Sequence, residues 1–289
     1  MLKPTGPYKI AAAGAFFTDP IRLETYAKDG SHRELPVAFW YPADCKTACP
    51  LVVFSHGGYG VKTSNRTLYE ELASHGYLVC AMDHSYQCFS TRNSKGKKIG
   101  INAGFLKETM RDDPNKRPEE SFQLHKKWME IRMGDIHLVI DAIKENANSA
   151  ELPVYCLADP ERIAVMGHSL GGSGALGIGR ARDDIAAVAA LEAPFMYDVQ
   201  GVEDGKYVFN PVPYPVPVLN VYSDTAWKSM KHWALYAVNA ALLESGRADV
   251  VNAHISGIGH FGLTDLSAKP QKTMQLNTIC LEFLDRFVR

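Results

Sequence analysis

The feature that most constrains this chain is a short apolar run that ends in a glycine-rich turn. Residues 164–166 (AVM) lead into residues 167–172 (GHSLGG), and small residues continue beyond them. This is a G-x-S-x-G pattern between a strand and a helix, and a serine on so sharp a turn needs neighbours without bulk two positions away on either side. The pattern therefore predicts that Ser169 is a nucleophile, with its hydroxyl above the positive N-terminal end of a helix.

Short apolar runs alternate with segments of helical periodicity along the rest of the chain. Val, Ile, Leu and Ala dominate the runs, which is typical of strands buried on both faces of a sheet. This alternation predicts an α/β fold with a mostly parallel sheet flanked by helices, in a single domain over residues 1–289. The expected strands are 36–41, 51–55, 77–83, 162–167, 186–192, 216–223 and 250–255, and the expected helices are 67–75, 128–145, 170–180, 227–244 and 276–287.

One polar stretch, residues 87–127, interrupts this alternation. It is rich in Lys, Arg and Asn, and it contains Pro114 and Pro118. The stretch is too long for an ordinary connection, and because it follows a strand it should emerge near the functional edge of the sheet. Two interpretations remain open, a lid over the site and a solvated excursion.

Composition excludes several classes of function. Thirty-one Lys and Arg stand against thirty-two Asp and Glu, so there is no basic excess to bind nucleic acid or an anionic membrane. No apolar stretch approaches the roughly 20 residues of a membrane span, and the N-terminal segment is unlike a secretory signal. We therefore expect a cytoplasmic protein without a nucleic-acid partner and without stable membrane insertion. The oligomeric state is left open.

The six cysteines are scattered and indicate mostly reduced core residues. Cys45 and Cys49 lie four positions apart, so a disulfide or half of a metal site is conceivable. No second pair of Cys or His follows at the spacing of a metal site, so we expect no metal and no cofactor.

A second signal for chemistry lies upstream of the serine. The apolar run 51–55 ends in residues 56–60 (HGGYG), and a strand ending in His-Gly-Gly matches the loop that donates one N–H group to an oxyanion hole. We assign this hole to the N–H groups of Gly58 and Leu170, with Tyr59 as the alternate donor if the loop is shifted by one residue.

The base and the acid should follow the serine in the order serine, acid, histidine. His260 lies in a glycine-rich loop just past the last expected strand, so it is the predicted base, whereas His254 lies within that strand. Two carboxylates, Glu192 and Asp224, end strands between the serine and His260. Either could accept a hydrogen bond from Nδ1 of His260, and the local sequence does not choose between them.

Several side chains near strand ends are candidates for the walls of a substrate pocket, although each would serve equally well in ordinary packing. They are Tyr59, His84, Tyr86, Phe195 and Trp227.

Together these segments resemble the plasma-type platelet-activating-factor acetylhydrolases and their bacterial relatives. The likeness covers nearly the whole chain in order, and it implies the α/β-hydrolase fold, close to the dienelactone hydrolases and cutinase-like enzymes. It rests on residues 5–8 (TGPY), 39–43 (FWYPA), 54–58 (FSHGG), 167–172 (GHSLGG), 191–193 (LEA) and 257–261 (GIGHF).

The resemblance also bears on the acid and on the substrate. In the acetylhydrolases the acid follows the strand after the serine helix, which maps onto Glu192, although Asp is usual there. In the cutinase-like enzymes it maps onto Asp224, and we favour Glu192. The implied activity is that of a serine carboxylesterase, or lipase-like hydrolase, on short-chain esters such as phospholipid acyl or polyester bonds. The implied substrate is therefore a small-molecule or lipid ester. An amidase or peptidase on the same scaffold, or a non-catalytic binding protein with this fold, is the alternative.

Overall fold

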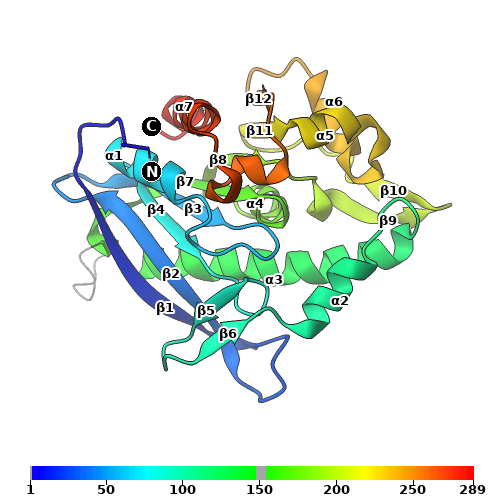
Figure 1. Ribbon diagram of the computed structural model, residues 1–289, viewed down its shortest axis with the longest axis horizontal. Coiled ribbons are helices and arrows are strands. Elements are labelled where there is room, and N and C mark those ends of the chain that lie inside the picture. The colour runs from blue at the N-terminus through cyan, green and yellow to red at the C-terminus, as the bar shows by residue number, and fades with distance from the viewer. Residues whose placement is uncertain (1, 148–153) are drawn as a thin grey trace.

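An eight-stranded sheet runs through the molecule (Figure 1), as seen in a computed structural model that describes residues 2–147 and 154–289. Residues 1 and 148–153 of the single domain expected over 1–289 lie outside the described residues. The strands lie side by side in the order β1 (Ile10–Leu23), β2 (His32–Pro42), β4 (Leu78–Met82), β3 (Cys49–Ser55), β7 (Ala158–His168), β8 (Ile185–Leu191), β11 (Val218–Ser223) and β12 (Val250–Ile255).

Strand direction agrees with the expected class. The pairs β1–β2 and β2–β4 are antiparallel, and every later neighbour pair is parallel. The α/β class with a mostly parallel sheet is therefore confirmed, and all seven expected strands are present. Strand β1 is missing from the expected set because it lies at the sheet edge, alternates between exposed and partly buried residues, and is built largely of small side chains.

Helices cover both faces of the sheet (Figure 1). Helices α3 (Pro118–Glu145) and α4 (Leu170–Ala181) pack in one core with alternate residues of β3, such as Leu51 and Val53. Helices α1 (Arg66–Ser74) and α7 (Pro270–Phe287) pack in the other core with the residues between them, Val52 and Phe54. This alternation follows from the two-residue period of a strand, which sends successive side chains to opposite faces.

Two helix predictions need correction. Helix α3 begins ten residues before the expected start, with Pro118 in its first turn, where a missing N–H costs nothing. The helix expected over 227–244 is broken into α5 (Asp224–Ser229), two short 3₁₀ turns and α6 (Ala237–Leu243). The chain is extended at Trp233, and the break leaves this residue and Tyr236 free to line a cavity.

The polar stretch 87–127 is folded rather than an open excursion. It forms a hairpin of β5 (Ser90–Arg92) and β6 (Lys98–Gly100), then α2 (Ala103–Arg111), and it continues into α3. Phe105 anchors α2, because its buried ring packs 5.7 Å from that of Tyr59 and 5.9 Å from that of Trp128. A second hairpin pairs β9 (Val199–Glu203) with β10 (Lys206–Phe209). No described helix is long and apolar enough to cross a bilayer.

Candidate active site

A sharp turn at Ser169 joins β7 to α4. Its backbone has φ of 52° and ψ of −126°, a positive-φ conformation that is uncommon outside glycine. The N–H of Ser169 donates to the Leu191 carbonyl at 2.9 Å, and its carbonyl accepts from the N–H of Ser173 at 3.0 Å. The turn is thus fixed from both β8 and α4, and strain of this kind concentrates at functional sites.

Glycines on either side of the serine allow the turn. A Cβ on Gly167 would lie 2.4 Å from the backbone of Gly171, and a Cβ on Gly171 would lie 2.1 Å from the Ser55 carbonyl oxygen. Both distances are far inside van der Waals contact, so neither position accepts a side chain. The expectation that residues two positions from the serine must lack bulk is confirmed.

A cavity of about 290 Å³, which we call the Tyr59 cavity, brings together Gly58, Tyr59, Ser169, Leu170 and His260. Leu170 is the first residue of α4, so its N–H is one of the helix donors without a partner inside the helix. A Cβ on Gly58 would meet nothing within 4 Å, so packing alone does not require glycine there.

The alternate donor is already engaged. The N–H of Tyr59 donates to the Gln87 carbonyl at 3.1 Å, which holds the loop against the strand-end segment after β4. The left-handed backbone of Tyr59, with φ of 65°, turns the loop toward Gln87. Of the two candidates on this loop, only Gly58 therefore keeps an N–H that could serve an oxyanion.

Glu192 and His260 are in direct contact. Oε1 of Glu192 lies 2.8 Å from Nδ1 of His260, and Oε2 accepts the N–H of Ser223 at 2.6 Å. Glu192 is only 1% exposed and has a positive φ of 50° at the end of β8. Burial raises the pKa of Glu192, but the hydrogen bonds from His260 and Ser223 outweigh burial, so the pKa lies below its ordinary value.

Asp224, the other candidate acid, has different partners. Its Oδ1 lies 2.8 Å from Nε2 of His254, and its Oδ2 accepts the N–H of Gly257 at 3.1 Å. Oδ2 also lies 3.3 Å from Nζ of Lys228. These contacts commit Asp224 to the end of β12 and to the start of the loop that carries His260.

His168, which directly precedes Ser169, supports the loop that carries His260. Nε2 of His168 lies 3.1 Å from the carbonyl oxygen of His260, and the two ring centroids are 4.5 Å apart. Burial lowers the pKa of His168 to about 3, so this ring is neutral at physiological pH. Among the described residues, no hydrogen bond joins the Ser169 hydroxyl to His260, but both side chains line the Tyr59 cavity.

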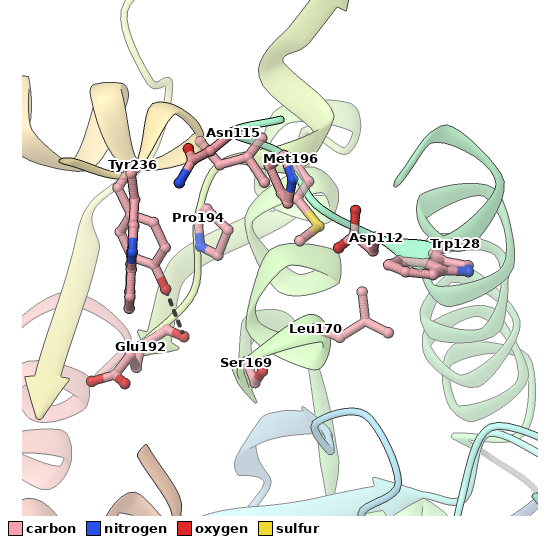
Figure 2. A pocket seen from close by; sticks show the side chains of 12 residues that line it. Asp112, Asn115, Trp128, Ser169, Leu170, Glu192, Pro194, Met196 and Tyr236 are labelled. Atoms are coloured by element: carbon pink, nitrogen blue, oxygen red, sulfur yellow. Dashed lines mark hydrogen bonds between the residues drawn. The ribbon is translucent and has the colours of Figure 1, made fainter. Parts of the chain in front are cut away.

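A second cavity, about 350 Å³ and here called the Trp233 cavity, also reaches the serine (Figure 2). It shares Ser169 and Leu170 with the Tyr59 cavity and includes Glu192, whose carbonyl accepts a hydrogen bond from Tyr236 at 3.3 Å. The polar stretch supplies part of its wall, so that stretch lies beside the serine; whether it moves as a lid stays a prediction. The remaining lining residues are Asp112, Pro114, Asn115, Trp128, Pro194, Met196, Trp233 and Leu235.

Of the five side chains predicted to form pocket walls, Tyr59 lines the Tyr59 cavity, and the other four line neither of the two cavities. His84 is fully buried between Ser55, 2.8 Å away, and Asp135, 2.8 Å away, so it cannot face a cavity. Phe195 is buried with its ring 5.3 Å from that of Tyr214.

Two further aromatic residues also lie elsewhere. Trp227 is 43% exposed and stacks on His254 outside both cavities. Tyr86 is half-buried and lines neither cavity. The aromatic walls of the Trp233 cavity that sequence reasoning missed are Trp128, Trp233 and Tyr236, which lie in segments without a motif of their own.

A buried arginine holds the loop that carries Gly58. Nη1 of Arg132 donates to the His56 carbonyl at 2.6 Å, and Nε donates to the side-chain oxygen of Gln87 at 2.7 Å. Burial lowers the pKa of Arg132 to about 9 and lowers that of His56 well below its ordinary value. A charged group inside α3 thus fixes the peptide that leads into the proposed oxyanion loop.

The cysteine pair does not form a disulfide. The sulfurs of Cys45 and Cys49 lie 3.7 Å apart, and both are free thiols. In the part of the chain that the structure describes, no group of three or more His, Cys, Asp or Glu side chains is placed to hold a metal.

Known proteins share parts of this sequence and its architecture. Platelet-activating factor acetylhydrolase from Bos taurus is 26% identical over 186 residues, which are 59% of this chain and 39% of that protein. Cutinase est2 from Thermobifida alba is 26% identical over 188 residues, 65% of this chain and 48% of that protein. The matches thus span about two fifths to one half of the length of these curated relatives.

A solved structure extends the likeness over nearly the whole fold. Ferulic acid esterase from Streptomyces cinnamoneus superposes with a TM-score of 0.71 at 18% identity, covering 99% of this chain and 92% of that one. This likeness bears on the fold alone, and the expected α/β-hydrolase fold is confirmed. The family described as platelet-activating factor acetylhydrolase, isoform II, matches residues 27–234, well over half of the chain. The chain therefore belongs to this family.

Proposed function

We propose that the protein is a serine carboxylesterase in which Ser169 is the nucleophile, His260 the general base and Glu192 the acid that orients it. The observation that carries the proposal is the 2.8 Å contact between Oε1 of Glu192 and Nδ1 of His260. His260 lines the same cavity as Ser169, which lies on a strained turn. A nucleophile, a base and an orienting acid in this relation form the template of acyl-transfer hydrolases.

In the proposed reaction Ser169 attacks the ester carbonyl while His260 takes the hydroxyl proton. The N–H groups of Gly58 and Leu170 stabilise the charge that develops on the carbonyl oxygen. His260 then returns the proton to the leaving alcohol, which leaves an acyl group on Ser169. Water, deprotonated by His260, hydrolyses this acyl-enzyme and restores the serine.

The electrostatics of the pair suit this cycle. Glu192 is ionised at neutral pH because its two hydrogen bonds overcome the cost of its burial. A buried carboxylate beside Nδ1 of His260 stabilises the imidazolium formed during attack and keeps Nε2 directed away from it, as the serine requires.

Two cavities that meet at the serine fit an ester with two arms. Ser169 and Leu170 line both the Tyr59 cavity and the Trp233 cavity, so a carbonyl bound there would have room on either side. Their volumes of about 290 and 350 Å³ suit short acyl and alcohol groups, such as a small-molecule ester or the acetyl end of a lipid. The names of the relatives agree with a carboxylic ester as substrate class.

The test compares Ser169→Ala with Ser173→Ala, one helical turn further along α4. We expect wild-type protein and Ser173→Ala to hydrolyse p-nitrophenyl acetate and to react with a fluorophosphonate probe, and Ser169→Ala to do neither while remaining folded. Turnover that survives in Ser169→Ala would contradict the mechanism. Failure of folded wild-type protein to react with the probe would favour a binding protein. A matched anilide that is cleaved as fast as the ester would indicate an amidase.

A further inference from the structure

A third hollow lies next to the Trp233 cavity, between α3 and the segment from residue 196 into β9. This groove, which we call the Met133 groove, has a volume of about 500 Å³, and its lining includes Phe122, Met129, Met133, Met196 and Val199. Met129 and Met133 are buried at their positions on α3, so they form a fixed floor rather than loose surface side chains.

One side chain belongs to both hollows. Met196 lines the Trp233 cavity with Ser169, and it also lines the Met133 groove. In the view of Figure 2 the Met196 side chain lies between those of Pro194 and Asp112. Because the Met196 side chain lines both hollows, they adjoin one another at this residue.

The chemistry of the groove selects its occupant. Three methionines line it, and thioether side chains are flexible, polarizable and apolar, so they adapt to an aliphatic chain. The charged and titratable residues of the lining, Lys126, Glu130 and His137, lie on α3 together with the methionine floor and give the groove a polar margin. An apolar trough with such a margin suits a hydrocarbon chain better than a sugar or an anion.

We propose that the Met133 groove is a subsite for the long aliphatic arm of the ester, reached from Ser169 past Met196. This subsite rests on the proposed esterase function and extends its substrate class from short acyl groups to esters with one extended hydrocarbon arm. The Met196 side chain sets where short substrates end and where longer ones enter the groove.

The experiment measures kcat/KM for p-nitrophenyl esters from acetate to dodecanoate and reports the ratio of dodecanoate to acetate. Met196→Ala removes most of the side chain that lines both hollows, which should open the way into the groove. We therefore expect this ratio to rise about tenfold, the effect of burying roughly two more methylenes. Gln200→Trp adds bulk to the groove from an exposed position on β9, so we expect the ratio to fall about tenfold.

A third variant tests the other route for the chain. Leu266→Trp narrows the Tyr59 cavity, which Leu266 lines from an exposed position. A ratio that falls only with Leu266→Trp, or that stays unchanged in both Met196→Ala and Gln200→Trp, would overturn the subsite. If Met196→Ala misfolds, Gln200→Trp decides alone. Either failure would leave the ester hydrolysis by Ser169 standing, whereas activity in Ser169→Ala would contradict the proposed function itself.

Discussion

Nε2 of His254 lies 2.8 Å from Oδ1 of Asp224, and Trp227 stacks on the same imidazole with ring centroids 4.7 Å apart. The other oxygen of Asp224 accepts the N–H of Gly257, three residues before His260. This cluster is partly exposed and holds the start of the histidine loop from outside. Asp224 therefore supports the loop, while Glu192 contacts the imidazole of His260 itself.

The two acids should respond differently to loss of charge. Glu192→Gln leaves the shape of the site but removes the buried carboxylate, so we expect kcat for p-nitrophenyl acetate to fall by about 10³–10⁴, as when a triad acid becomes its amide. Asp224→Asn should lower kcat by less than about tenfold, because the loop keeps its other contacts. Equal, mild losses in steady-state assays of both variants would show that neither carboxylate orients the base.

The proposed oxyanion loop can be tested through its backbone. Gly58→Pro removes the N–H assigned to the oxyanion, so we expect kcat to fall by about 10²–10³. Gly58→Ala is the matched control: its Cβ meets nothing within 4 Å in the fold, but it would enter the space for substrate. It should therefore raise KM more than it lowers kcat. The same kcat in Gly58→Pro and Gly58→Ala would exclude this N–H from catalysis.

The pH dependence of stability should report the buried His168. Its pKa is lowered from about 6.5 to about 3 by burial, so between these values the unfolded chain binds a proton that the folded protein does not. This group therefore makes the free energy of unfolding rise with pH, by up to about 1.4 kcal/mol per pH unit within that window.

Urea unfolding between pH 3.5 and 6.5 measures this slope. His168→Phe should lower the slope by the amount that corresponds to about one bound proton. His232→Phe, a substitution at an exposed position, should leave the slope unchanged. A slope that is the same in His168→Phe and in the wild-type protein would mean that His168 titrates normally in the folded state.

The fold could be predicted where burial alone decides the pattern. Strands such as β3 and β4 are apolar along their length because parallel strands are covered on both faces, and apolar runs are visible in sequence. Strand β1 could not be found this way, because its pairing with β2 at the sheet edge leaves half of its residues exposed. The break at Trp233 depends on side chains that pack beside the serine, which no local periodicity records.

Only part of the candidate site could be predicted from the sequence. Chain order and a glycine-rich turn indicate Ser169 and His260, but Glu192 and Asp224 both end neighbouring strands and satisfy that order equally. The positive φ of Glu192 and its bond to the Ser223 amide, which direct the carboxylate to His260, arise only in three dimensions. His84 also follows the end of a strand, and this position suggests a pocket wall. Its contact with Asp135 of α3, which is distant in the sequence, holds it in the interior instead.

The buried Arg132 should contribute to both stability and catalysis. Its guanidinium donates to the His56 carbonyl and to the Gln87 side chain, and these two groups hold the loop that carries Gly58. Arg132→Met keeps much of the volume but leaves both acceptors buried without a donor, at a cost of about 1–3 kcal/mol each. We expect the free energy of unfolding in urea to fall by about 2–4 kcal/mol, and kcat to fall about tenfold because the loop loosens.

Arg162→Met is the control, since Arg162 pairs with Asp159 in a partly exposed bridge worth at most about 1 kcal/mol. A variant at Arg132 that is as stable and as active as Arg162→Met would show that relief of the buried charge offsets the lost hydrogen bonds, and that Arg132 does not hold the loop.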